Sequence, residues 1–341
     1  MVSPDRVRVM ARFDKMVVGP RLSWALAVAL LLATSPAILS AQAPPGEDWM
    51  TLETEHFRVT YPSELLDLAQ RAGERAERAW TALAATLVEP PNNKVDLVIT
   101  DHADISNGFA QVFPSNRIVV FAPPPVDGFG LPFMDEWLEL VVTHELVHTF
   151  HQDRARNLGG FLRKIFGRVP LEWPFFPGSA TPGWTEEGMA TYYESELTQA
   201  GRVRGSFHEM VVRTAILEDG FESIDQTSGD SPVWPGGQRY YIYGSLFLKY
   251  LTDLHGEEAM GSFVEAVAGQ WIPGPAHRHA SVQSESKMRS SEANISSQSP
   301  CEKRHGHVLG QVATHTASLT LICLWLLVGK RHQQPGFGAS P

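Results

Sequence analysis

The pentapeptide His-Glu-Leu-Val-His at residues 144–148 is the feature that most restricts how this chain can fold. If residues 135–153 form a helix, His144 and His148 lie one turn apart on one face, and both imidazoles can reach a single zinc ion. Glu145 then lies beside the metal without binding it. A zinc ion that activates water needs two nitrogen ligands, a carboxylate from elsewhere, an open coordination position and a free carboxylate that accepts the proton. The pentapeptide therefore predicts a helix that carries a metal site.

The predicted helix over residues 135–153 is apolar on nearly all sides. A helix of this pattern is buried, so its two histidines and Glu145 would be polar groups in an interior of low dielectric constant, where they need partners. A metal ion is one such partner. The alternative is that His144 and His148 are core histidines bonded to neighbouring carbonyl groups. The apolar positions are Trp137, Leu138, Leu140, Val141, Val142, Leu146, Val147 and Phe150.

The N-terminal residues have the composition of a targeting segment. Residues 1–21 carry five basic and two acidic residues, and the apolar run 24–33 follows, with small residues around Ala41-Gln42-Ala43. This order predicts a signal peptide over residues 1–43 and an exported protein, periplasmic or extracellular. An uncleaved anchor is the alternative, although the apolar run is short for a membrane span.

The C-terminal residues 276–341 predict a low-complexity tail. They are rich in Ser, Gln and His, and six of the thirteen histidines lie between residues 277 and 332. The apolar segment 317–329 is a marginal membrane anchor, shorter than the roughly 20 residues that a spanning helix needs. Any association with a membrane is expected through this segment or through the N-terminal one.

The body of the chain, residues 44–275, is strongly acidic. The whole chain has a net charge of −10, the leader contributes +3 and the tail +4, so the body stands at −17. We therefore expect no binding to nucleic acid. Both cysteines, Cys301 and Cys323, lie in the tail, so the body has neither a disulfide nor thiol chemistry.

The spacing of apolar residues in the body predicts an α+β fold. Strands should alternate with one long helix, residues 64–87, before the helix over residues 135–153, and the third and fourth strands should form a hairpin. Ser63 and Asp135 are the expected N-caps of these two helices. A small mixed β-sheet lobe, the metal helix and a mainly helical C-terminal lobe follow from this order. The expected strands are residues 57–61, 94–100, 109–113 and 117–122.

A later segment connects the pentapeptide to a known superfamily. Glu187 follows His148 by 39 residues, within the sequence Trp-Thr-Glu-Glu-Gly-Met-Ala at 184–190. Together the two segments resemble the gluzincin clan, which includes thermolysin and the zinc aminopeptidases, and the exported bacterial peptidase MA-like domain. The resemblance implies a zincin-like fold, Zn²⁺ held by His144, His148 and Glu187, and Glu145 as the general base.

Residues 241–251 resemble the aminopeptidase helix with the pattern Tyr-x-x-Gly, whose tyrosine hydrogen-bonds the oxyanion of the reaction. Tyr241 is the position that matches, and Tyr243 is the neighbouring alternative. Plain core packing is the other interpretation of these clustered tyrosines.

Two further residues belong to the expected site. Glu194 lies seven residues after Glu187 on the same helical face, where it either orients a ligand histidine through its other ring nitrogen or is a solvated carboxylate. His151 shares a face with His148, but three nitrogens along one helix axis do not readily close a tetrahedron. We expect His151 either to contact a metal-binding residue without binding the metal itself or to lie at the surface.

The chain departs from the superfamily in two places. The separation of His148 and Glu187 is about twice that usual in the aminopeptidases, and the insert over residues 153–182 is expected to be a lid over the cleft or a docking segment. The aminopeptidase strand that captures a free amino terminus has no counterpart near residues 107–110. Exopeptidase specificity therefore does not follow.

Three functions are compatible with these residues. The leading one is an exported zinc-dependent peptidase that hydrolyses a peptide or protein substrate with a metal-activated water. The second is a gluzincin-like module that binds or assembles in the bacterial envelope without catalysis. The third is a zinc hydrolase that acts on another ester or amide.

Overall fold

The computed structural model of the chain describes residues 46–126, 133–221 and 233–271. The predicted signal peptide, residues 1–43, and the predicted tail, residues 276–341, lie outside the described residues. Within the described part of the chain, every helix is too short or too polar to span a lipid bilayer.

Five strands form one mixed sheet with the order β1-β2-β3-β5-β4. The three central strands run parallel, and the two edge strands, β1 and β4, are antiparallel to their neighbours. The expected hairpin is present as the pair β4–β5. Strand β1 was not predicted, because its side chains are mostly exposed and show no apolar alternation. The strands are β1 (Trp49–Glu53), β2 (Phe57–Pro62), β3 (Val95–Thr100), β4 (Gly108–Gln111) and β5 (Arg117–Phe121).

Helix α2 (Leu66–Thr86) packs on the sheet with a face of small residues. Its buried positions are mostly alanine, which lets the helix approach β2 and β3 closely, and Trp80 fills the space that remains. The Trp80 ring lies edge-on to Phe57 and Phe150, with ring centroids 5.6 and 5.1 Å apart. The helix begins later than expected: Ser63–Leu65 form a 3₁₀ turn, η1, and the Ser63 side chain caps nothing.

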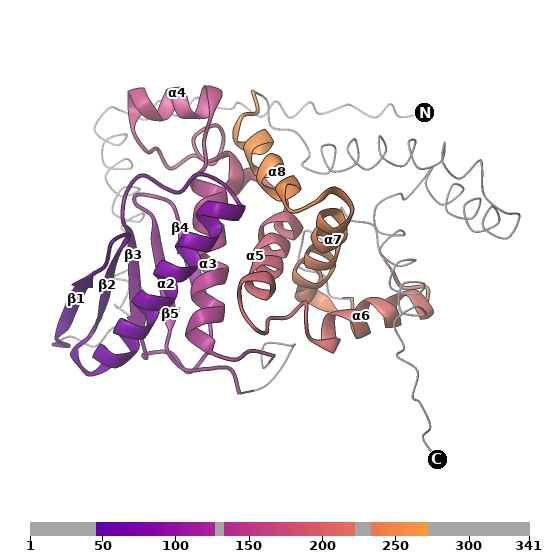
Figure 1. The fold of residues 1–341 in the computed structure, drawn as a ribbon, viewed down its shortest axis with the longest axis horizontal. Helices are drawn as coiled ribbons and strands as arrows, with labels where there is room; N and C mark the ends of the chain where they lie inside the picture. Colours follow the sequence, from indigo (N-terminus) through magenta and orange to yellow (C-terminus); the bar gives the residue numbers. More distant parts are fainter. Residues whose placement is uncertain (1–45, 127–132, 222–232, 272–341) are drawn as a thin grey trace, which may run out of the picture. The chain divides into compact units, whose positions relative to one another are not determined.

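The remaining helices follow the sheet in the chain, and the fold is α+β, as predicted. Helix α3 is buried on all sides between the sheet, α2 and α5 (Figure 1). Asp135 is not its cap: Glu136 is the N-cap, and its carboxylate binds two arginines of α2 instead of the helix backbone. The elements are α3 (Trp137–Asp153), α4 (Asn157–Phe166), η2 (Pro177–Ala180), α5 (Gly183–Leu197), α6 (Ser206–Leu217), η4 (Gly236–Gln238), α7 (Arg239–His255) and α8 (Glu258–Ala268).

Helices α5 and α7 cross through two glycines. A Cβ atom on Gly188 would lie 2.5 Å from the carbonyl carbon of Gly244, so neither position has room for a side chain. This backbone contact places Tyr241, one turn before Gly244, beside Glu187, the residue before Gly188. The close crossing therefore brings Glu187 of α5 and Tyr241 of α7 to one site.

Candidate metal centre

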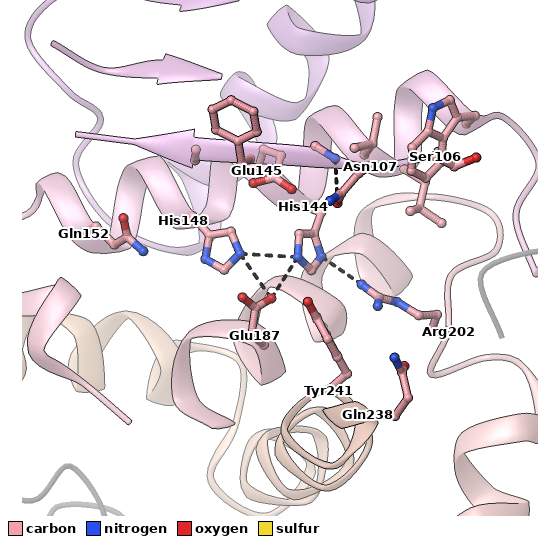
Figure 2. Close-up of a pocket in the computed structure, with 16 residues that line it drawn as sticks. Ser106, Asn107, His144, Glu145, His148, Gln152, Glu187, Arg202, Gln238 and Tyr241 are labelled. Carbon is pink, nitrogen blue, oxygen red and sulfur yellow. Dashed lines mark hydrogen bonds and ion pairs between the residues drawn. The ribbon is translucent and has the colours of Figure 1, made fainter. Parts of the chain in front are cut away.

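Three potential ligand atoms from α3 and α5 meet at one point. The Nε2 atom of His144 lies 3.2 Å from Oε2 of Glu187 and 3.3 Å from Nε2 of His148, and the third side of the triangle measures 3.4 Å (Figure 2). Ligand atoms in a tetrahedral zinc site, with bonds of ~2.0–2.1 Å, are about 3.3–3.4 Å apart. The group is therefore one that could bind a metal ion, and its spacing fits a tetrahedral one.

The hydrogen-bonding state of His144 supports the same conclusion. Its Nδ1 lies 2.9 Å from Oε2 of Glu194. Burial raises the pKa of Glu194, but Arg202 outweighs burial and lowers it to about 2, so this carboxylate is ionised and can only accept a hydrogen bond. The Nδ1 atom of His144 then donates a hydrogen bond to Glu194, which leaves Nε2 as the ring nitrogen that can bind a cation. The ring nitrogens and the Glu187 carboxylate that meet here need a cation, or protons, between them.

The electrostatics of the site favour a positive charge at its centre. Burial lowers the pKa of His148, but the adjacent Glu187 carboxylate outweighs burial and raises the pKa to about 9. Burial acts in the opposite sense on Glu187, and the two histidines outweigh it, holding the pKa of this carboxyl well below its usual range. Either a bound cation or protons on the two histidines can supply this charge, since the pKa of His144 is raised as well.

Arg202 is the one residue of this network that sequence reasoning missed. Its guanidinium binds Glu194 through Nε and Nη2, each 2.7 Å from a carboxylate oxygen, and both side chains are buried. Full burial of Glu194 excludes the solvated alternative. Gly201, with φ of 92°, turns the chain after α5 so that Arg202 reaches back to the helix, and a Cβ there would meet Oγ of Ser195 at 2.5 Å. The glycine indicates a turn at this position, but no pattern in the sequence indicates that Arg202 pairs with Glu194.

Glu145 lies next to the three-atom cluster but does not belong to it. Its side chain is buried beside the edge strand β4, where a Cβ on Gly108 would lie 3.1 Å from Oε1 (Figure 2). Burial raises the pKa of this carboxyl above its ordinary value. A carboxyl group with a raised pKa in this position is suited to accept a proton and return it.

A cleft of about 270 Å³ opens in front of these residues. The edge strand β4 forms one wall, the first turns of α3 form an apolar floor, and polar side chains complete the opposite wall (Figure 2). The insert was expected to form a lid, but no residue from 154 to 182 lines the cleft, so that prediction is wrong for the described residues. Besides the four residues 144, 145, 148 and 187, the lining includes Asn107, Gly108, Phe109, Trp137, Leu140, Val141, Gln152, Arg202, Gln238 and Tyr241.

Of the two candidate tyrosines, only Tyr241 lines the cleft. Its ring centroid lies 6.3 Å from that of His144, and the Arg202 guanidinium carbon lies 4.7 Å from the ring centroid. Burial, reinforced by Glu187, raises the pKa of the Tyr241 hydroxyl, which therefore keeps its proton at neutral pH. Tyr243 instead packs against Phe221 in the core, with ring centroids 4.8 Å apart.

His151 does not join the cluster, and it is not at the surface. The side chain is buried, and neither ring nitrogen has a hydrogen-bond partner among the described residues. Burial lowers its pKa to about 3, so the ring is neutral. The surface alternative for His151 is therefore wrong.

Comparison with known proteins gives distant structural likeness alone. No protein-family model matches the chain, and no curated protein matches its sequence. Among solved structures, the chain is similar to yeast LTA4 hydrolase in complex with bestatin, at 15% identity and a TM-score of 0.40, covering 67% of this chain and 34% of that one. It is also similar to native leukotriene A4 hydrolase from Saccharomyces cerevisiae, at 15% identity and a TM-score of 0.39, covering 64% of this chain and 32% of that one. A third similar structure is native yeast LTA4 hydrolase, at 14% identity and a TM-score of 0.42, covering 86% of this chain and 40% of that one.

The chain spans only between 32% and 40% of the length of these solved structures. TM-scores below 0.5 carry no functional inference, so function has to be argued from the side chains of the site.

Proposed function

We propose that this chain is a zinc-dependent peptidase in which His144, His148 and Glu187 hold the metal. The supporting observation is the triangle of ligand atoms with sides of 3.2, 3.3 and 3.4 Å, at the floor of a cleft. Two imidazole nitrogens and one carboxylate oxygen form a donor set that suits zinc, and catalytic zinc sites have three protein ligands. Zinc bound there would polarise a substrate carbonyl and lower the pKa of a water molecule toward ~7.

Glu145 moves the proton in this proposal. Its carboxylate accepts a proton from the water that attacks the carbonyl carbon, and a carbon–oxygen bond forms. The same carboxyl then donates the proton to the amide nitrogen as the carbon–nitrogen bond breaks, and the amine leaves. The raised pKa of Glu145 fits both halves of this transfer, because the group has to bind the proton and then release it.

Tyr241 and the edge strand orient the substrate. The Tyr241 hydroxyl keeps its proton and faces the cleft, where it donates a hydrogen bond to the oxyanion that develops on the carbonyl oxygen. Among the described residues, strand β4 has a strand neighbour on one side only, and Gly108, Phe109 and Ala110 line the cleft. An extended peptide adds to such an edge through main-chain hydrogen bonds.

The role of Glu145 separates a peptidase from a zinc-binding module. In the purified full chain, we expect about one zinc ion per chain by mass spectrometry of the elements, and cleavage of casein. The variant Glu145→Gln should keep the zinc and lose at least ~100-fold in rate. Glu139→Gln, on the same helix and paired with Arg78, is the matched control and should retain both.

Three results would contradict the proposal. Zinc without turnover of casein or of a peptide library would favour a binding module, and absence of zinc from a correctly folded chain would remove the metal centre altogether. Turnover of esters with no turnover of peptides would point to another zinc hydrolase.

Export also stays a proposal, supported by the composition of residues 1–43. The mass of the mature N-terminus tests it, with cleavage expected after Ala43. A peptide or protein remains the proposed partner, and the charge of −17 on the body argues against nucleic acid.

A further inference from the structure

Helix α4 exposes large apolar side chains to solvent. Phe161 and Ile165 lie one turn apart on its outer face and are 60% and 57% exposed, and Phe166 at the end of the helix is 65% exposed. The inner face is already used: Leu162 packs on a small separate cluster of Val112, Phe175 and Phe176. The α4 patch, defined as Phe161, Ile165 and Phe166, therefore has no role in the core of the described residues.

The chain around the α4 patch is basic. Residues 154–171 contain five cationic residues and no carboxylate, within a body whose net charge is −17. Four of the cations bind carboxylates from other segments. The fifth, Lys164, lies between Phe161 and Ile165 in the helix; it is exposed, and the described residues offer it no ion-pair partner. Apolar groups and a free positive charge thus share one surface.

We propose that the α4 patch docks this protein on an anionic lipid bilayer. Aromatic and aliphatic side chains beside lysine or arginine are the composition of helices that lie in the membrane interface, where the rings enter the headgroup region and the cation meets phosphate. The two ends of this chain are net positive, at +3 and +4, so neither complements the basic segment. A second copy that presented the same face would bring one Lys164 against the other.

Docking through α4 would also hold the cleft near the membrane. Arg163 and Arg168 of this segment bind Asp153, the last residue of α3, and the preceding residue, Gln152, lines the cleft. Figure 1 shows α4 beyond the C-terminal end of α3. These ion pairs tie the α4 patch to the helix that carries the two histidines. The proposal itself depends on neither the metal nor any reaction.

Vesicle flotation of the full chain tests the proposal. We expect binding to vesicles of equal parts phosphatidylcholine and phosphatidylglycerol, and weaker binding to phosphatidylcholine alone. The variant F161S/I165S should bind the anionic vesicles roughly tenfold less well. The matched control, M210S/L217S, removes two exposed apolar residues of α6 (48% and 71% exposed) and should bind as the wild type does. Equal binding by both variants, or none by the wild type, would overturn the proposal.

A fluorescent label distinguishes the α4 patch from the apolar ends of the chain and from self-association. With Cys301 and Cys323 replaced by serine, an environment-sensitive dye is attached to F161C or to L217C. The dye at position 161 should shift to the blue with anionic vesicles, and the dye at 217 should not. A shift at both positions or at neither, or a shift at 161 without vesicles together with dimers in sedimentation, contradicts docking on lipid.

Discussion

The two halves of the molecule bury different kinds of groups. The sheet half, β1–β5 with α2, has an apolar interior. Its arginine and lysine ion pairs, including those that α2 makes with the start of α3, lie at the periphery, where the participating side chains are 17–61% exposed. The helical half, α3, α5 and α7 with the loop that follows α5, buries ionised groups completely. The difference separates a half that is stabilised by apolar packing from a half that buries a charged network beside the proposed metal site.

The buried network of the helical half is costly to desolvate. Removing two charges from water costs several kcal/mol per ion, and their mutual attraction recovers this only with good geometry. Glu194 is fully buried, yet Arg202 binds both of its oxygens and His144 occupies the remaining side. We interpret the network as a device that holds the His144 ring in one orientation and one tautomer, at some expense of stability.

The largest effect is expected from Arg202→Ala. The change leaves the Glu194 carboxylate buried without its counter-ion, so the free energy of unfolding should fall by about 3–5 kcal/mol. A protonated Glu194 is a weaker hydrogen-bond acceptor for His144 than the carboxylate, so zinc affinity should fall roughly 10- to 100-fold. Urea unfolding measures the free energy of unfolding, and zinc titration against a chelator measures the zinc affinity. Arg204→Ala, in the same loop but exposed, removes a hydrogen bond to the carbonyl oxygen of Ser195; it should cost far less stability and leave zinc affinity unchanged.

A double variant tests the interpretation of that loss. Replacing both partners, E194M/R202M, removes the buried charges together and should recover much of the stability, but not the zinc affinity. If zinc affinity returned with stability, the network would only support the fold, and the contrast between the two halves would disappear.

Tyr241→Phe should affect the reaction alone. Removal of one oxyanion donor typically costs about 10²–10³ in kcat, whereas the ring packing on Arg202 is retained. Steady-state kinetics should therefore show a loss in kcat, with zinc content and unfolding unchanged. Tyr243→Phe, in the core behind the cleft, is the control. Equal losses in both variants would argue against a role for the Tyr241 hydroxyl.

Leu97→Ala should show the opposite behaviour in the sheet half. Leu97 is fully buried in β3, and its truncation leaves a cavity that costs roughly 3 kcal/mol. The folded variant should still bind zinc as tightly as the wild type, because no charge or ligand has moved. If zinc affinity fell while the variant was still folded, the two halves would be energetically coupled, in spite of their different interiors.

Sequence reasoning predicted local features but missed two tertiary contacts. Helix α3 follows from the spacing of His144 and His148 and from its continuous apolar pattern, and the central strands follow from their alternation. The ion pair between Glu194 and Arg202 could not be predicted, since Arg202 reaches Glu194 only through a turn at Gly201. The position of the insert, residues 153–182, could not be predicted either. It depends on the packing of Phe175 and Phe176 against Val112, which is distant in the sequence.

The smallest effect concerns the periphery of the sheet half at low pH. Burial raises the pKa of Glu136, but Arg71 and Arg75 outweigh burial and hold it below its ordinary value of 4.5. A carboxyl with a lowered pKa in the folded state contributes stability above pH 4.5, and the contribution disappears as the pH falls through the folded value. Glu136→Gln should therefore cost no more than about 1 kcal/mol at neutral pH and almost nothing in acid. Urea unfolding at both pH values measures the difference, and a loss that persists unchanged in acid would show that Glu136 acts through packing rather than charge.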